Sequence, residues 1–253
     1  MIHLNHDLSQ TDLPCILFLH GFLGNMDQWD KVQHKTTHIP SFKIELPGHG
    51  HSDDCVKSYS INELADQVEI LIHSYNLSNI HLMGHSMGGY VAANIAHKIP
   101  ERMLSLTLIN SIAGGDSPDR IKSRDRSLKL IAKFRNAFVN MAIANLFSED
   151  ERTEFYDEIE AMKKQAVNIS SESVIHAILA MRNRESSLEK LKLKQLELAY
   201  IYSTTDPIVP KEKVLKEIQL LHAKGYEIES GHMSILTHPE KISSILNSIV
   251  LSH

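Results

Sequence analysis

One serine of this chain stands in a setting that could make its hydroxyl a nucleophile. Ser86 is the centre of a Gly-x-Ser-x-Gly pentad, residues 84–88, which follows a short apolar run and precedes a run with helical periodicity. Flanking glycines permit a sharp turn that lifts the serine hydroxyl clear of a sheet edge. The helix that follows directs free N–H groups and the positive end of its dipole toward a developing oxyanion. The pentad therefore predicts attack by Ser86 on a carbonyl group.

A serine nucleophile needs a histidine base, and the chain has 16 histidines. His85 precedes Ser86 directly, but adjacent side chains on a tight turn rarely reach each other, so we expect His85 to pack beneath the turn. His232 follows a predicted strand and a glycine, in the loop before the last helix, and is the predicted base. Asp206 directly follows an earlier strand and is the predicted acid, because Ser, Asp, His is the order in which one sheet architecture arranges its triad.

Backbone N–H groups near the serine are predicted to form an oxyanion hole. Met87, directly after the serine, supplies one donor, and Phe22, in the loop after the first long strand, supplies the second. The side chains of Leu23, Trp29 and Met233 are predicted to bind the substrate.

Other polar clusters have a structural or solvated interpretation. Asn110 and Ser111 end a strand at the same sheet edge, where polar side chains are usually solvated. Residues 49–54 resemble part of a two-metal His-x-His-x-Asp-His signature but end in Asp54, so no metal site is predicted. The acidic residues 149–151 are typical of the start of a helix.

The elements that must hold these residues alternate between short apolar runs and longer runs with helical periodicity. Predicted strands cover residues 15–20, 42–46, 80–83, 104–109, 198–202 and 226–228. Predicted helices cover residues 60–75, 86–98, 211–221 and 239–250. Ser60 and Glu63 have the spacing of a capping box at the start of the first of these helices. The alternation predicts an α/β fold with a mostly parallel, doubly wound sheet.

The alternation breaks between residues 114 and 189, where helical patterns occur without a strand. Two apolar stripes there are interpreted as the core of a helical block: Leu128, Ile131, Phe134, Phe138 and Met141, and then Val174, Ile175, Ile178, Leu179 and Met181. An insertion at this point would lie over the carboxyl ends of the strands. We therefore predict an α/β core formed by residues 1–113 and 190–253, with a helical cap formed by residues 114–189.

Composition and charge exclude several classes of protein. The 253 residues carry a formal net charge of −5, which argues against a nucleic-acid partner. The basic run of residues 120–126 is interspersed with aspartate and is interpreted as a solvated helix face. Two cysteines, Cys15 and Cys55, cannot form a disulfide scaffold.

The hydropathy of the chain and its first residues bear on its compartment and its partners. No apolar run approaches the roughly 18 residues that span a bilayer, and the first residues lack the pattern of a signal peptide. We expect a cytoplasmic protein that acts on a small molecule, with no metal, no organic cofactor and no nucleic-acid or membrane partner. The oligomeric state stays open.

Together these motifs resemble the α/β-hydrolase fold family, over nearly the whole chain. The matching segments are residues 20–24, 46–52, 84–89, 206–210 and 231–232. The sequences of these segments are most similar to those of small capped bacterial members of the family, which include esterases, enol-lactonases and carbon–carbon bond hydrolases. The resemblance implies Ser86 as nucleophile, Asp206 as acid and His232 as base.

The expected reaction is hydrolysis of a small, largely apolar ester or related acyl substrate through an acyl-enzyme. Two alternatives stay open: a carbon–carbon bond hydrolase or lyase with the same triad, and a receptor-like ligand-binding protein whose triad turns over slowly. Tyr90 stands where the menaquinone-pathway lyase of this fold usually carries an arginine. This departure argues against an anionic-substrate lyase.

Overall fold

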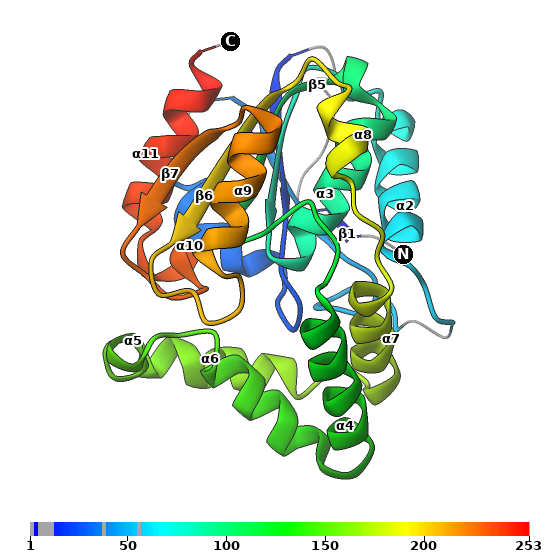
Figure 1. The fold of residues 1–253 in the computed structure, drawn as a ribbon, viewed down its shortest axis with the longest axis vertical. Helices are drawn as coiled ribbons and strands as arrows, with labels where there is room; N and C mark the ends of the chain where they lie inside the picture. The colour runs from blue at the N-terminus through cyan, green and yellow to red at the C-terminus, as the bar shows by residue number, and fades with distance from the viewer. Residues whose placement is uncertain (1–2, 5–12, 37–38, 55–56, 253) are drawn as a thin grey trace.

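The fold is built on a seven-stranded sheet with the strand order β1-β3-β2-β4-β5-β6-β7 (Figure 1). The computed structural model describes residues 3–4, 13–36, 39–54 and 57–252, so Cys55 lies outside the described residues. The strands are β1 (His3–Leu4), β2 (Cys15–Leu19), β3 (Ser41–Glu45), β4 (Ile80–His85), β5 (Met103–Ile109), β6 (Glu197–Ser203) and β7 (Lys224–Ile228). β2 to β7 are parallel, and β1 pairs antiparallel with β3. The prediction of a mostly parallel sheet is confirmed.

Helices cover both faces of this sheet (Figure 1). One layer consists of α2 (Ile61–Ser74), α3 (Met87–Lys98), α8 (Leu188–Lys192) and α9 (Lys211–Leu221), each in contact with the next. The other consists of α1 (Asp30–Gln33), α10 (Ser234–Thr237) and α11 (Pro239–Val250). Two short 3-10 helices, η1 (Met26–Trp29) and η2 (Pro100–Arg102), directly precede α1 and β5. The fold is therefore doubly wound, as predicted.

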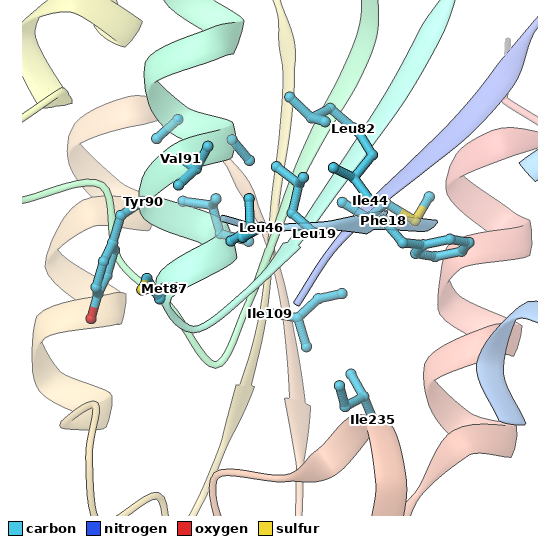
Figure 2. Close-up of a cluster of buried hydrophobic side chains, with 14 of the residues drawn as sticks. Phe18, Leu19, Ile44, Leu46, Leu82, Met87, Tyr90, Val91, Ile109 and Ile235 are labelled. Atoms are coloured by element: carbon cyan, nitrogen blue, oxygen red, sulfur yellow. The ribbon is translucent and has the colours of Figure 1, made fainter. Parts of the chain in front are cut away.

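The central strands are buried on both faces, which explains their unbroken apolar runs. Every residue of β2 is buried, and so is every residue of β4. Figure 2 shows Phe18 and Leu19 of β2 beside Leu82 of β4, with Met87 and Val91 of α3 in the same cluster. This packing holds the carboxyl ends of β2 and β4, and thus the loops that follow them, in a fixed relation.

Helix α2 begins with the predicted capping box. The Glu63 N–H donates to the Ser60 hydroxyl over 3.1 Å, and the Ser60 N–H donates to the Glu63 carboxylate over 2.6 Å. Two N–H groups that the first helical turn leaves without acceptors are thereby satisfied.

A group of helices follows β5 and lies beyond the carboxyl ends of the strands (Figure 1). It contains α4 (Pro118–Ala144), α5 (Glu149–Glu154), α6 (Tyr156–Ala166) and α7 (Ser171–Arg182), with α4 in contact with both α6 and α7. We call these four helices the cap. The division of the chain at residues 114 and 189 stays a prediction. No helix within the described ranges combines the length and apolar character that crossing a membrane requires.

The first apolar stripe of the cap is only partly buried. Ile131 and Phe138 are buried as predicted, but Phe134 is 63% exposed and Met141 is 47% exposed. Phe134 has non-helical backbone angles (φ −141°, ψ 49°), so α4 is kinked there and its 3.6-residue period is interrupted. Met141 lies on the wall of a cavity instead of in the cap core. The interpretation of these two residues as core was wrong, whereas Val174, Ile178 and Met181 of the second stripe are buried.

Candidate active site

Ser86 lies in a strained turn between β4 and α3. Its backbone angles (φ 53°, ψ −117°) lie in a region that side-chain-bearing residues rarely adopt, and it is the N-cap residue of α3. A Cβ atom on Gly84 would come within 2.5 Å of the Gly88 carbonyl oxygen, and one on Gly88 within 2.3 Å of the Leu19 carbonyl oxygen. The two glycines are therefore required by close packing of the turn against itself and against β2.

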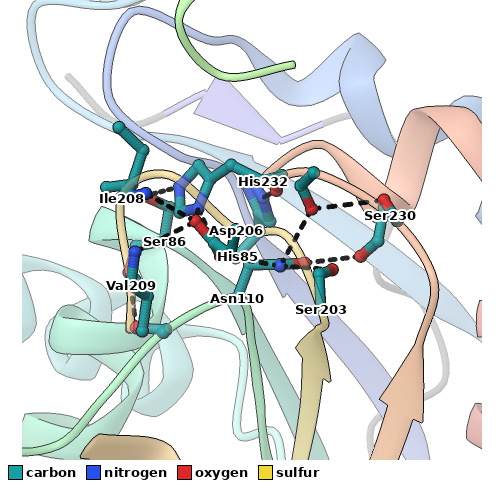
Figure 3. A network of polar contacts seen from close by, with 12 residues as sticks. His85, Ser86, Asn110, Ser203, Asp206, Ile208, Val209, Ser230 and His232 are labelled. Carbon is teal, nitrogen blue, oxygen red and sulfur yellow. Dashed lines mark hydrogen bonds and ion pairs between the residues drawn. The ribbon is translucent and has the colours of Figure 1, made fainter. Parts of the chain in front are cut away.

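The structure brings Ser86, His232 and Asp206 into one chain of hydrogen bonds (Figure 3). His232 Nε2 lies 2.8 Å from Ser86 Oγ, and His232 Nδ1 lies 2.9 Å and 2.8 Å from the two carboxylate oxygens of Asp206. An ionised carboxylate can only accept, so Nδ1 carries the proton and the unprotonated Nε2 accepts from the Ser86 hydroxyl. This is the tautomer that a general base for Ser86 requires.

Several donors hold the Asp206 carboxylate in its ionised form. The N–H groups of Ile208 and Val209 donate to Oδ1 over 2.8 Å and 3.0 Å, and Asn110 Nδ2 donates to Oδ2 over 2.9 Å. Burial by itself raises the pKa of Asp206, but His232 and these donors outweigh burial and lower it below its ordinary value. Asp206 is thereby fixed in orientation as well as in charge.

Asn110 and Ser111 are not solvated, and the expectation that they were was wrong. Both are buried, because the end of β5 lies between the ends of β4 and β6. Asn110 Nδ2 also donates to Ser203 Oγ over 2.8 Å, and Ser111 Oγ donates to the Ser86 carbonyl oxygen over 2.7 Å. Two polar residues directly after a central strand are the sequence signal for this role, but their partners come from distant segments.

His85 packs beneath the turn, as expected. Its side chain is buried, its Nε2 lies 2.9 Å from the His232 carbonyl oxygen, and its ring stands edge-on to Trp29 at 6.4 Å. Burial, with repulsion from His232, lowers the pKa of His85 to about 3. The neutral ring donates to the backbone of His232, and so it supports the residue that contacts Ser86.

A cavity of about 220 Å³ opens above Ser86 and His232. Phe22 lines it, and so do Leu23 and Met233, two of the three residues whose side chains were predicted to bind the substrate. The other lining residues include Tyr90, Arg120, Arg124, Phe138, Met141, Ile178 and Met181, most of which come from the cap. Cap and core therefore enclose one site together.

Trp29 is not among the residues that line this cavity. Its side chain is fully buried, with its ring centre 4.7 Å from that of Phe18 on β2. This position in the core gives no support to the expectation that Trp29 binds the substrate.

The loop that carries Phe22 lies against the Ser86 turn. A Cβ atom on Gly21 would come within 3.1 Å of Ser86 Cβ and 2.9 Å of His85 Nδ1, so only a glycine lets this loop approach so closely. Met87 is the first residue of α3, and its N–H therefore has no acceptor within the helix. The two backbone segments that were predicted to supply oxyanion donors thus flank the serine.

Comparison with known proteins identifies the family of the chain. The model of the alpha/beta hydrolase fold family matches residues 14–239. This chain belongs to the alpha/beta hydrolase family. A thermophilic esterase from Thermogutta terrifontis superimposes with a TM-score of 0.88 at 22% identity, covering 100% of this chain and 93% of that one. The enol-lactonase from Burkholderia xenovorans LB400 gives a TM-score of 0.88 at 17% identity, covering 99% and 96%. At these identities the likeness shows the fold alone.

Curated relatives of this chain match over shorter segments. The 2-succinyl-6-hydroxy-2,4-cyclohexadiene-1-carboxylate synthase of Klebsiella pneumoniae (strain 342) is 38% identical over 93 residues, which is 36% of this chain and 35% of the synthase. The matched segments of three such relatives span between 28% and 64% of their own lengths.

The cap is tied to the loop that carries His232. The Gly231 N–H donates to both carboxylate oxygens of Glu151 at 3.0 Å, and the His232 N–H donates to the Leu146 carbonyl oxygen over 2.8 Å. Burial raises the pKa of Glu151, but the N–H donors of Gly231 and Ser148 outweigh it, and the pKa falls below its ordinary value. Glu151 also forms the predicted helix start, as part of a capping box with Ser148. The sequence carried no signal for its second contact.

None of residues 49–54, the candidate metal run, lines this cavity. His49 is buried, and its Nδ1 lies 3.1 Å from the Pro47 carbonyl oxygen. Burial, with repulsion from His20, lowers the pKa of His49 to about 3. Within the part of the chain that the structure describes, no three His, Cys, Asp or Glu side chains form a group suited to a metal ion.

Proposed function

We propose that this protein is a serine hydrolase that cleaves a small, largely apolar ester or related acyl substrate through an acyl-enzyme. The observation that carries the proposal is the hydrogen-bonded chain from Ser86 Oγ through His232 to Asp206, which opens into the cavity beneath the cap. Two further observations support it: Ser86 lies in a strained turn at the N-terminus of α3, and the chain belongs to the alpha/beta hydrolase family.

The proposed reaction has two halves. His232 Nε2 takes the hydroxyl proton while Ser86 Oγ attacks the ester carbonyl carbon, and the N–H groups of Met87 and Phe22 stabilise the resulting oxyanion. The protonated His232 then gives its proton to the departing alcohol oxygen. In the second half His232 activates a water molecule, which releases the acid and restores Ser86. Asp206 stays ionised throughout and stabilises the imidazolium.

The cavity walls support an acyl substrate of modest size. Leu23, Phe138, Met141, Ile178 and Met233 contribute apolar side chains, and the volume is about 220 Å³. Mostly apolar walls with a few polar groups are typical of sites that bind small molecules. A short acyl chain can lie against these side chains with its carbonyl carbon at Ser86.

Hydrolysis of p-nitrophenyl acetate, butyrate and octanoate tests the proposal. We expect turnover of the acetate and butyrate within the ordinary range of about 1–10³ s⁻¹ and slower turnover of the octanoate, whose chain is long for the cavity. Released p-nitrophenolate measures the rate. If the folded protein hydrolyses none of the three esters, the proposal of ester hydrolysis fails.

Replacing Asp206 by asparagine is expected to lower kcat about 10⁴-fold. The amide can donate to His232 Nδ1, which favours the tautomer whose Nε2 carries the proton and cannot accept from Ser86. The Ser203→Ala variant serves as the comparison, because it removes the hydroxyl that accepts from Asn110 in the same network and leaves the Asp206 carboxylate and its donors in place; it should retain more activity than Asp206→Asn. Near-normal turnover by Asp206→Asn would remove Asp206 from the mechanism.

A carbon–carbon bond hydrolase or lyase is the second candidate. The observation that favours it is the 38% identity, over 93 residues, with a relative named as a 2-succinyl-6-hydroxy-2,4-cyclohexadiene-1-carboxylate synthase. The same triad would then act on a carbanion or a gem-diol instead of an ester. Product analysis with a vinylogous diketone separates the candidates, because only a carbon–carbon hydrolase splits it into a carboxylic acid and a smaller carbon fragment.

A further inference from the structure

Arginines from the cap and from the segment after it gather at one wall of the cavity. Arg120 and Arg124, both on α4, line the cavity. The guanidinium carbon of Arg184 lies 3.7 Å from the centre of the Tyr90 ring, which lines the same wall. Among the described lining residues there is no aspartate or glutamate. The interpretation of residues 120–126 as a solvated face was therefore wrong for Arg120 and Arg124.

One carboxylate partly balances this charge. Asp116 accepts from Arg124 Nε over 2.5 Å and from Arg184 Nη1 over 2.6 Å, and its side chain is 4% exposed. Burial raises the pKa of Asp116, but Arg124 and Arg184 outweigh burial and lower it, so the carboxylate stays ionised. Asp116 pairs with Arg124 and Arg184, and Glu217 also interacts electrostatically with Arg184, so the positive charge left unbalanced at this wall is that of Arg120.

Arg120 is the arginine that this pairing leaves out. Its backbone N–H donates to Ser117 at the start of α4, but its guanidinium makes no hydrogen bond or ion pair with any described residue. Burial, with repulsion from Arg124, lowers the pKa of Arg120, and the attraction of Asp116 only partly offsets this effect. A partly desolvated cation without a hydrogen-bonded partner carries a free-energy cost, and an anion that enters the cavity would offset that cost.

We propose that this wall binds a carboxylate group of the substrate, with Arg120 as its direct partner. The inference rests on the proposed ester hydrolysis and names its substrate class, an ester whose acyl chain ends in a carboxylate. Tyr90, which stands in place of an arginine, was interpreted as evidence against an anionic-substrate lyase. The cations come from elsewhere: from α4 and from Arg184.

The position of this wall sets the length of the acyl chain. Ser86 is the N-cap residue of α3 and Tyr90 lies in its first turn. Four residues advance a helix by about 6 Å along its axis. An anionic group held beside Tyr90 and Arg120 is therefore separated from the reacting carbonyl by a short chain, as in a half-ester of a small dicarboxylic acid. A planar guanidinium can hold such a carboxylate through two parallel hydrogen bonds.

A pair of matched esters tests the inference. Mono-p-nitrophenyl glutarate and p-nitrophenyl pentanoate have acyl chains of equal length that end in a carboxylate and a methyl group. We expect kcat/KM of the wild type to be at least about tenfold higher for the glutarate ester. Because a hydrogen bond to a charged group contributes about 1.5–3 kcal/mol, Arg120→Gln should lower this ratio roughly 10- to 100-fold.

Arg126→Gln is the matched control. Arg126 lies on the same helix and is exposed outside the cavity, so its loss removes an equal charge without touching the site. This variant should keep the wild-type ratio of the two kcat/KM values. An equal fall in Arg126→Gln and Arg120→Gln would overturn the inference, because the preference would then reflect net charge.

Free glutarate separates this inference from the proposed hydrolysis. It should raise the melting temperature of the wild type and not that of Arg120→Gln. If both esters are hydrolysed equally well and glutarate does not stabilise the wild type, the carboxylate site is excluded while ester hydrolysis stands. If neither ester is hydrolysed but glutarate still stabilises the wild type through Arg120, the site stands and the proposed reaction fails.

Discussion

Replacing Ser86 by alanine is expected to lower kcat for p-nitrophenyl butyrate about 10⁶-fold. Without the hydroxyl, His232 has no nucleophile to activate, and no acyl-enzyme can form. The glycine-flanked turn and the hydrogen bonds of Asp206 do not depend on the Ser86 side chain, so the variant should fold normally. Single-turnover kinetics with the purified variant would measure the loss, and a melting curve would check the fold.

Ser127→Ala provides the control for this experiment, because Ser127 is another serine that lines the cavity but lies on α4. Its loss should change kcat only a few-fold. A fluorophosphonate probe supplies a second readout, since it should modify the wild type at Ser86 and leave Ser86→Ala unmodified. Labelling of Ser127, or normal turnover by Ser86→Ala, would contradict the assignment of the nucleophile.

Replacing His232 by alanine should also lower kcat about 10⁶-fold, and the double variant with Ser86→Ala should lose no more than either single variant. The reason is that the two groups act as one unit: Nε2 lies 2.8 Å from Oγ and is the described acceptor for its proton. Comparing kcat for the two single variants and the double variant measures this coupling.

His238→Ala is the matched control for the second experiment. His238 follows α10 a few residues after the predicted base, and its ring contacts Thr237 and not Ser86. Its loss should leave kcat within a few-fold of the wild type. If losses from Ser86→Ala and His232→Ala were instead multiplicative, the two residues would act independently, and His232 would not be the base for Ser86.

Much of the fold could be predicted because its signals are local. The capping box at Ser60 and Glu63 starts α2 as predicted, and the predicted bounds of α9 and α11 agree with those observed. The site followed from the same kind of signal: a turn that only glycines permit around Ser86, and strand ends that bring Asp206 and His232 to the same sheet edge.

The rest depends on contacts between segments that lie far apart in the sequence. Asn110 could not be connected to Asp206 before the ends of β5 and β6 were placed side by side. The kink at Phe134 arises in a helix whose apolar periodicity predicts a straight course. A basic run beside aspartates gave no indication that Arg120 faces a cavity while its neighbour Arg124 pairs with Asp116.

The hydrogen bonds from Gly231 and His232 to Glu151 and Leu146 make the cap a poor candidate for transplantation. Exchanging residues 114–189 for the corresponding insertion of another family member would remove both hydrogen-bond acceptors, the Glu151 carboxylate and the Leu146 carbonyl oxygen. Two buried N–H groups would lose their partners, at about 1–3 kcal/mol each, and the loop could relax away from Ser86. A chimera could thus keep every residue of the triad and still lose its alignment. In evolution, the cap and the loop that carries His232 would have to change together.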